Sequence, residues 1–188
     1  MPDLVATPGQ TVGPFFHHAL PFPGDRELVP RGQAGSVRLH DYVYDGRGTG
    51  VPDALLEIRQ ADAGGAVPRV EGSLRREGAP FTGWGRSSTD LTGHYWFSTL
   101  EPGPTHAGAA PCIAVTVFAR GLLNRLFTRV YLPAALEVLD ADPLLSGLDA
   151  GRREIMVAVR EPCGSLRFDI HLQGDRESVF LTFPRHPE

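Results

Sequence analysis

Short apolar segments separated by glycine and proline constrain the fold of this chain more than any other feature of its sequence. The segments that can form strands recur at intervals of roughly ten residues, with turn-forming residues between them. The 188 residues include 22 glycines and 17 prolines, and both residue types interrupt helices. Many short strands joined by such turns are typical of stacked antiparallel sheets. The sequence therefore predicts an all-β fold, an antiparallel β-sandwich with long loops and an extended N-terminal arm.

The length favours one domain, since 188 residues can build a single hydrophobic core. We expect residues 1–35 to form an N-terminal arm and loop and residues 36–188 to form the β-sandwich domain. Prolines throughout the arm resist both helix formation and strand pairing. The segment Thr11–Phe16 is nevertheless apolar and aromatic, and such side chains are costly to leave in water. We therefore expect the arm to dock, either on its own core or on a partner chain.

Charge and composition exclude several classes of partner. The net charge of −4 argues against nucleic acid, and no run approaches the roughly 20 apolar residues that span a bilayer. No basic-then-apolar segment begins the chain, so we expect no signal peptide and a cytoplasmic protein. In that compartment Cys112 and Cys163 are expected to be free, buried thiols rather than a disulfide, and two cysteines do not make a zinc site.

Alternation of apolar and polar residues locates the strands. Ile113, Val115 and Val117 share one face of the segment Cys112–Phe118, and the other face is also mostly apolar, which predicts a central strand buried on both sides. One short helix is expected near Leu136–Leu139. The other expected strands are Val37–Asp45, with a bulge at Asp41–Tyr42, and Ala54–Asp62, Trp84–Ser88, Gly93–Thr99, Phe127–Leu132, Glu154–Arg160, Ser165–Gln173 and Ser178–Phe183.

Nine short motifs follow one another in a fixed order. They are Thr7–Phe16, Val43–Gly46, Leu56–Asp62, Gly85–Arg86, Gly93–Phe97, Pro102–Pro104, Phe118–Gly121, Thr128–Tyr131 and Arg167–Ile170. As an ordered set that covers most of the chain, they resemble the intradiol ring-cleavage dioxygenases. The resemblance implies a β-sandwich and an enzyme that uses ferric iron and O2 to cleave a dihydroxylated aromatic ring between its two hydroxyls. For this chain it implies 3,4-dihydroxybenzoate as substrate and 3-carboxy-cis,cis-muconate as product.

The same resemblance bears on the metal. Iron-binding chains of this family carry a Tyr just after Pro-Gly-Pro and a His-x-His at the start of the next strand. Here Thr105, Cys112 and Ala114 stand at those positions, and no Tyr occurs between Tyr44 and Tyr95, where a further ligand is expected. Threonine supplies no phenolate, alanine supplies no donor, and a lone cysteine does not hold ferric iron. The resemblance therefore implies a chain without metal ligands or catalytic residues, an alpha subunit whose partner, an iron-binding beta subunit, holds Fe(III).

Four substrate-binding residues follow from the resemblance. Thr11, Gly13 and Pro14 of the arm are expected to line an active site shared by the two chain types, and Arg120 is expected to border it. Glycine allows close backbone approach, and proline offers a rigid wall to an aromatic ring. The guanidinium of Arg120 matches the two oxygens of an aromatic carboxylate. A surface ion pair is the alternative role of Arg120.

Two other functions remain open from the sequence. The chain could be a β-sandwich binding or structural module that lost its catalytic site and forms homo-oligomers. The intact arm favours the dioxygenase subunit over this alternative, because a module without a shared site has no use for it. Iron could also be held by unusual ligands such as His94, Tyr95 and His106, although the positions expected to bind it carry no suitable donors.

Overall fold

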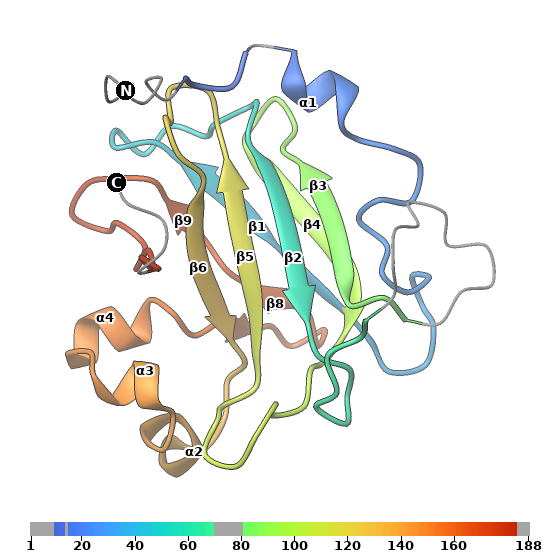
Figure 1. Cartoon of the computed structure of the whole chain (residues 1–188), viewed down its shortest axis with the longest axis vertical. Coiled ribbons are helices and arrows are strands. Elements are labelled where there is room, and N and C mark those ends of the chain that lie inside the picture. Colours follow the sequence, from blue (N-terminus) through green and yellow to red (C-terminus); the bar gives the residue numbers. More distant parts are fainter. Residues whose placement is uncertain (1–9, 14, 70–80, 184–188) are drawn as a thin grey trace, which may run out of the picture.

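Two sheets packed face to face form the body of the protein (Figure 1). The structure is a computed structural model that describes residues 10–13, 15–69 and 81–183. Its strands are β1 (Ser36–Tyr44), β2 (Leu55–Gln60), β3 (Trp84–Ser88), β4 (His94–Leu100), β5 (Cys112–Phe118), β6 (Leu126–Tyr131), β7 (Val159–Arg160), β8 (Leu166–Arg167) and β9 (Ile170–His171). One sheet has the antiparallel order β3-β2-β5-β6, and the other has the order β4-β1-β8-β7. In the second sheet β1 pairs antiparallel with β4 and parallel with β8 and β9. The predicted β-sandwich is confirmed.

The core lies between the sheets because every second residue of each long strand points inward. Strand β2 buries Leu56 and Ile58, and β4 buries Tyr95 and Phe97. The predicted inward face of β5, Ile113, Val115 and Val117, is also buried. The Tyr95 hydroxyl donates a hydrogen bond to the carbonyl oxygen of Phe168, so this large side chain satisfies its polar atom inside the core.

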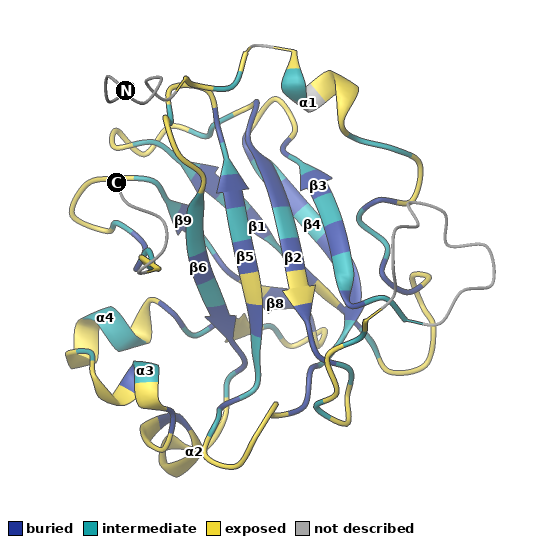
Figure 2. Cartoon of the chain, in the orientation of Figure 1, coloured by how far each residue is buried: buried dark blue, intermediate teal, exposed yellow. Residues whose placement is uncertain are grey.

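The prediction that β5 is buried on both faces is wrong. On its outer face Ala114 is exposed, and Cys112 and Thr116 are only half-buried. Figure 2 shows exposed stretches on β2 and β5 where their outer faces meet the surface. The reason is that the second sheet covers only the inner face of β5, and small outward side chains such as Ala114 do not need covering.

The expected bulge at Asp41–Tyr42 is also wrong. Strand β1 keeps a continuous register with β4 from Ser36 to Tyr42, and its burial alternates without interruption. Asp41 takes an inward position because its carboxylate accepts a hydrogen bond from Nε of Arg167 at 2.9 Å. The charged side chain of Asp41 can therefore stand at a buried, otherwise apolar position of β1, because its partner comes from a segment 126 residues away.

The turn at Asp90–Gly93 joins two strands that do not pair with each other. Strand β3 belongs to one sheet and β4 to the other, so the turn crosses between layers. Gly93 has a φ of +87°, a conformation that favours glycine. A Cβ on Gly50 would lie 1.9 Å from the carbonyl oxygen of Thr92, so this crossing requires glycine there as well.

The C-terminal third is more helical than predicted. The expected helix is present as α2 (Leu136–Asp140), whereas α3 (Pro143–Ser146), α4 (Ala150–Glu154) and, after the arm, α1 (Phe16–Ala19) were not predicted. The expected strands 154–160 and 165–173 shrink to β7, β8 and β9, and residues 178–183 form no strand. Aspartate caps begin α3 and α4, which explains the additional helices. Strands β7, β8 and β9 are shorter than expected because each of them pairs with its neighbours over only two residues. Within the described ranges, no helix is long and apolar enough to cross a membrane.

Both cysteines are free, as predicted, but they are less buried than expected. Cys112 is half-buried on the outer face of β5, and Cys163 is exposed in the turn between β7 and β8. The division at residue 35 into an arm and a sandwich domain stays a prediction.

Asp169 gives a pH-dependent prediction for stability. Burial, and then the nearby Asp41 carboxylate, raise the pKa of Asp169, and its Oδ1 is buried without a hydrogen-bond partner among the described residues. A raised pKa means that the stability from protonated Asp169 is present below the unfolded-state pKa and is lost as pH rises through the folded-state pKa. We therefore expect Asp169→Asn to raise Tm by about 2–4 °C at pH 7, corresponding to about 1 kcal/mol.

Thermal unfolding at pH 7 and pH 3.5 checks this expectation. The gain should shrink at the lower pH, where the native side chain is itself largely neutral. Asp175→Asn, in an exposed turn, is the matched control and should change Tm little at either pH. An equal gain at both pH values would contradict the electrostatic explanation.

Candidate functional site

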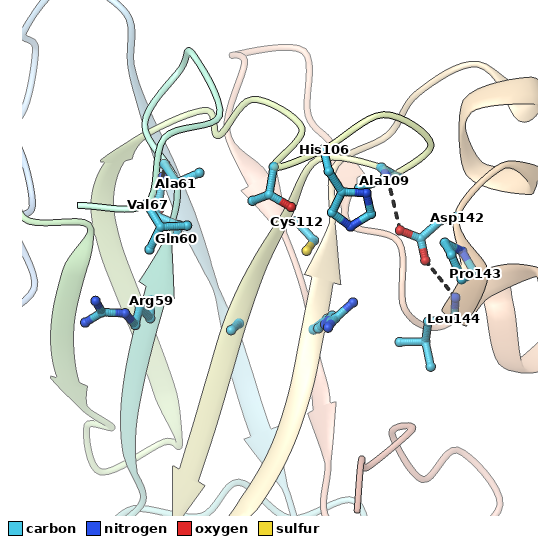
Figure 3. A pocket seen from close by; sticks show the side chains of 14 residues that line it. Arg59, Gln60, Ala61, Val67, His106, Ala109, Cys112, Asp142, Pro143 and Leu144 are labelled. Carbon is cyan, nitrogen blue, oxygen red and sulfur yellow. Dashed lines mark hydrogen bonds between the residues drawn. The ribbon is translucent and has the colours of Figure 1, made fainter. Parts of the chain in front are cut away.

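A cavity of about 510 Å³ lies over the outer face of the β3-β2-β5-β6 sheet, where β5 begins. Thr105, Cys112 and Ala114 all line it, so the structure brings together the three positions at which the sequence analysis looked for iron ligands. Figure 3 shows Cys112 in the middle of the cavity, with Arg59 on one side and Asp142 on the other. The remaining lining residues are Gln60, Ala61, Val67, His106, Ala109, Ala110, Arg129, Pro143 and Leu144.

The donor set of this cavity does not fit ferric iron. Burial raises the pKa of the Cys112 thiol, outweighing the effect of nearby Arg129, so the sulfur is not the thiolate that a metal needs. Thr105 offers only an alcohol, and Ala114 offers nothing. His106 is an exposed imidazole that shares the cavity lining with two arginines. Over the described ranges, no three His, Cys, Asp or Glu side chains gather in a way that could hold a metal ion.

Asp142 supplies the carboxylate of the cavity lining, and both of its oxygens accept hydrogen bonds. Its Oδ2 accepts from the backbone N–H of Ala110 at 3.0 Å, and its Oδ1 accepts from the N–H groups of Leu144 and Leu145 and from the Tyr131 hydroxyl at 3.1 Å. Burial acts to raise the pKa of Asp142, but these hydrogen bonds outweigh it and lower the pKa. Asp142 is therefore a charged structural residue that caps α3 and is not positioned as a base.

Two arginines flank Ala114 on the outer face of the sheet. In the strand register Arg59 of β2 and Arg129 of β6 both lie opposite Ala114. Arg129 donates to the Tyr131 hydroxyl at 3.2 Å, and Arg59 donates to the carbonyl oxygen of Pro68 at 3.1 Å. Burial raises the pKa of Tyr131 far above its usual value, so its hydroxyl keeps the proton that it donates to Asp142. Both arginines lie in motifs of the ordered set, Leu56–Asp62 and Thr128–Tyr131, but no sequence signal places them side by side, because their proximity results from strand pairing.

The N-terminal arm docks at the other end of β5. The hydroxyl oxygen of Thr11 accepts a hydrogen bond from the backbone N–H of Gly121 at 2.7 Å, which places Thr11 beside Arg120. Gln10 and Val12 line a cavity of about 190 Å³ together with residues 118–119 and 122–125. In Figure 1 the arm lies at the end of the sandwich toward which β5 points, away from the loop that precedes β5.

Arg120 forms an ion pair, the alternative role expected for it, and its partner is Asp53. Its Nη2 lies 3.0 Å from Oδ2 of Asp53, and the arginine side chain is 59% exposed while that of the aspartate is 11% exposed. The alternative role of Arg120 as a member of an ion pair is therefore present, and more than half of its side-chain surface remains exposed. Asp53 could not be found from sequence, because it lies in a turn 67 positions earlier.

Gly13 and Pro14 are the two other arm residues expected to line the substrate site. Gly13 is exposed, and a Cβ added to it would meet nothing within 4 Å, so the space beside its Cα is open among the described residues. Pro14 lies outside the described residues. Their expected contact with substrate stays a prediction, as it does for Thr11 and Arg120.

The unusual ligand set His94, Tyr95 and His106 does not come together. The hydroxyl of Tyr95 is buried in the core and donates to Phe168, whereas His106 is exposed in the loop before β5. The neighbouring His94 points to the opposite face of β4 from Tyr95, beside Tyr42. No single ion could contact all three side chains.

Comparison with known proteins identifies the family. No family model matches the chain. It is 37% identical over 197 residues to the protocatechuate 3,4-dioxygenase alpha chain of Burkholderia cepacia, covering 96% of this chain and 99% of that one. It is 34% identical to the alpha chain of Pseudomonas putida, with 96% and 98% covered. The match to the beta chain of Burkholderia cepacia is shorter, 31% over 126 residues, and covers 62% of this chain and 52% of that one.

A solved structure agrees with this assignment. The dioxygenase domain of a dioxygenase and carbohydrate-binding protein fusion from Streptomyces sp. SirexAA-E superposes with a TM-score of 0.59 at 25% identity, and 89% of this chain and 98% of that one are covered. The full-length match to two alpha chains carries the more specific statement. This chain belongs to the protocatechuate 3,4-dioxygenase alpha chains of the intradiol ring-cleavage dioxygenase family.

Proposed function

We propose that this chain is the iron-free alpha subunit of a cytoplasmic protocatechuate 3,4-dioxygenase. The enzyme would cleave 3,4-dihydroxybenzoate with O2 to 3-carboxy-cis,cis-muconate, with Fe(III) held by a beta chain. The observation that supports this most strongly is the cavity at the start of β5. It gathers Thr105, Cys112 and Ala114, and none of them suits ferric iron.

The part of this chain in the reaction is to bind, orient and enclose the substrate. The ferric ion of the partner chain supplies the activation of the catechol toward O2. Thr11 fixes the arm at Gly121, and Asp53 pairs with Arg120, whose side chain is more than half exposed. At an interface with the beta chain, the guanidinium of Arg120 would face the substrate carboxylate and the arm would exclude water. Orientation and exclusion of water of this kind contribute several kcal/mol to catalysis.

Native mass spectrometry of the complex purified through a tag on this chain tests the proposal. We expect one additional chain type in equal number, one iron per pair, and conversion of 3,4-dihydroxybenzoate by the complex but not by this chain alone. A metal-free homo-oligomer would overturn the proposal and favour the binding or structural module.

The ion pair of Asp53 gives a prediction for this function. Asp53→Asn removes the charge that fixes Arg120, so the guanidinium becomes less well oriented toward the substrate carboxylate. We expect KM for 3,4-dihydroxybenzoate to rise about 3- to 5-fold, which corresponds to about 1 kcal/mol, with a smaller change in kcat. Steady-state kinetics of the complex measures both parameters.

Two companion variants separate this positioning role from a general loss of structure. Asp53→Glu keeps the charge and should recover most of the affinity. Asp62→Asn changes a carboxylate in a turn near the other end of the sandwich and should leave KM unchanged. An unchanged KM in Asp53→Asn would show that the ion pair does not position Arg120 for substrate.

A further inference from the structure

The cavity over Ala114 contains two guanidinium groups without a carboxylate partner in the described part of the chain. None of the ion pairs found there involves Arg59 or Arg129, whereas eight other arginines each pair with an acid. Arg129 is half-buried, and a buried charge is costly to leave unpaired. Among the described residues its one acceptor is the Tyr131 hydroxyl, a neutral group, so within that part of the chain most of its five N–H donors remain available to a ligand.

The nearby carboxylate of Asp142 attracts Arg129 but can compensate for only one of the two positive charges. The two oxygens of Asp142 accept four hydrogen bonds, from the N–H groups of Ala110, Leu144 and Leu145 and from the hydroxyl of Tyr131. Two arginines against one fully engaged aspartate leave the cavity electropositive. An anion is therefore the ligand that this lining favours.

The walls and floor indicate what kind of anion fits. Ala114 contributes only a methyl group between the two arginines, whose Cα atoms are about 10 Å apart because they lie on strands to either side. Ala61, Cys112 and Leu144 add apolar wall. A volume of about 510 Å³ is within the range of small-molecule sites, which are typically about 300–1,000 Å³. A flat apolar ring over Ala114 would contact the apolar walls of the cavity. A carboxylate at one end of the ring would accept hydrogen bonds from the parallel N–H donors of a guanidinium.

We propose that this cavity binds a small aromatic carboxylate, with the carboxylate held by Arg129 and the far edge of the ring reached by Arg59. The site is separate from the arm and Arg120, which lie at the opposite end of β5, about 20 Å away along a seven-residue strand. The inference rests on the lining of the cavity and not on the proposed function.

Equilibrium dialysis and ¹⁹F NMR with 4-fluorobenzoate test the proposal. The full chain is used together with any chain that purifies with it, so that a site elsewhere in the complex contributes equally to every sample. We expect Arg129→Met to raise the Kd of one bound 4-fluorobenzoate per chain at least about tenfold, because a charged hydrogen-bonded pair is lost, so at a ligand concentration near the native Kd this molecule is largely absent.

Two further variants keep the test decisive if Arg129→Met folds poorly. Ala114→Phe fills the cavity from an exposed position on β5 and should remove the same bound molecule. Arg47→Met, in an exposed turn outside the cavity, is the matched control and should bind as the native chain does. An equal Kd in the native chain and both cavity variants would overturn the proposal. So would full displacement by an equal concentration of inorganic phosphate, because the cavity would then select charge and not an aromatic acid.

Discussion

Replacing Asp142 with alanine should lower the free energy of unfolding by about 3 kcal/mol, the largest effect on stability that we expect from a polar residue of this chain. The buried carboxylate accepts from three backbone N–H groups, those of Ala110, Leu144 and Leu145, and from the Tyr131 hydroxyl. Alanine would leave all four donors without this acceptor. No side chain would then link the loop before β5, the end of β6 and the start of α3 as Asp142 does.

Urea denaturation of the native chain and the variant at pH 7 measures this loss. Asp149→Ala is the matched control, because Asp149 caps α4 but its side chain accepts only the N–H of Arg152. That change should cost about 1 kcal/mol, as a single lost helix cap does. Equal losses in the two variants would show that the four hydrogen bonds of Asp142 do not act together.

The pH dependence supplies a second check. The hydrogen bonds to Asp142 lower its pKa against the effect of burial. The stability that ionised Asp142 contributes is therefore present above the unfolded-state pKa, about 3.9 for an aspartate, and is lost as pH falls through the lower folded-state value. The difference in stability between the native chain and Asp142→Ala should accordingly shrink in acid.

The core of this fold could be predicted from sequence because the alternation of apolar residues with polar or small ones is visible within each strand. Leu56 and Ile58, like Ile113 and Val115, alternate with polar or small residues, and a strand with one buried face requires such alternation. Asp41 breaks the pattern because its partner, Arg167, comes from a distant segment. Helix α2 could be predicted, but α3 and α4 could not, because helices of four or five residues with aspartate caps leave only a weak periodic signal, and the two-residue strands leave even less.

The candidate site, too, could be predicted from the sequence only in part. The family resemblance placed Thr105, Cys112 and Ala114 at positions where iron-binding chains carry metal ligands. The structure gathers all three around one cavity. The contacts that give the cavity and the arm their chemistry depend on tertiary pairing. Arg59 and Arg129 meet only because their strands both flank β5, and Asp53 reaches Arg120 only in the folded chain.

Arg120→Met should lower kcat/KM of the complex for 3,4-dihydroxybenzoate about 10- to 100-fold. The proposed role of Arg120 is a charged hydrogen bond to the substrate carboxylate, and such bonds contribute about 1.5–3 kcal/mol. Methionine keeps much of the length and the apolar stem of the side chain but removes its donors. Because the native side chain is more than half exposed, the change should leave the fold intact.

The comparison that tests this role uses a substrate without the carboxylate. Catechol keeps the two ring hydroxyls but has nothing to pair with Arg120, so its kcat/KM should be nearly the same in the native complex and in Arg120→Met. Arg47→Met changes an exposed arginine in a turn that does not line the cavity of the arm, and should leave both substrates unaffected. If Arg120→Met slowed both substrates equally, the arginine would act on the assembly of the complex and not on the carboxylate. Arg120→Lys should recover only part of the activity, since an ammonium lacks the two parallel donors that match a carboxylate.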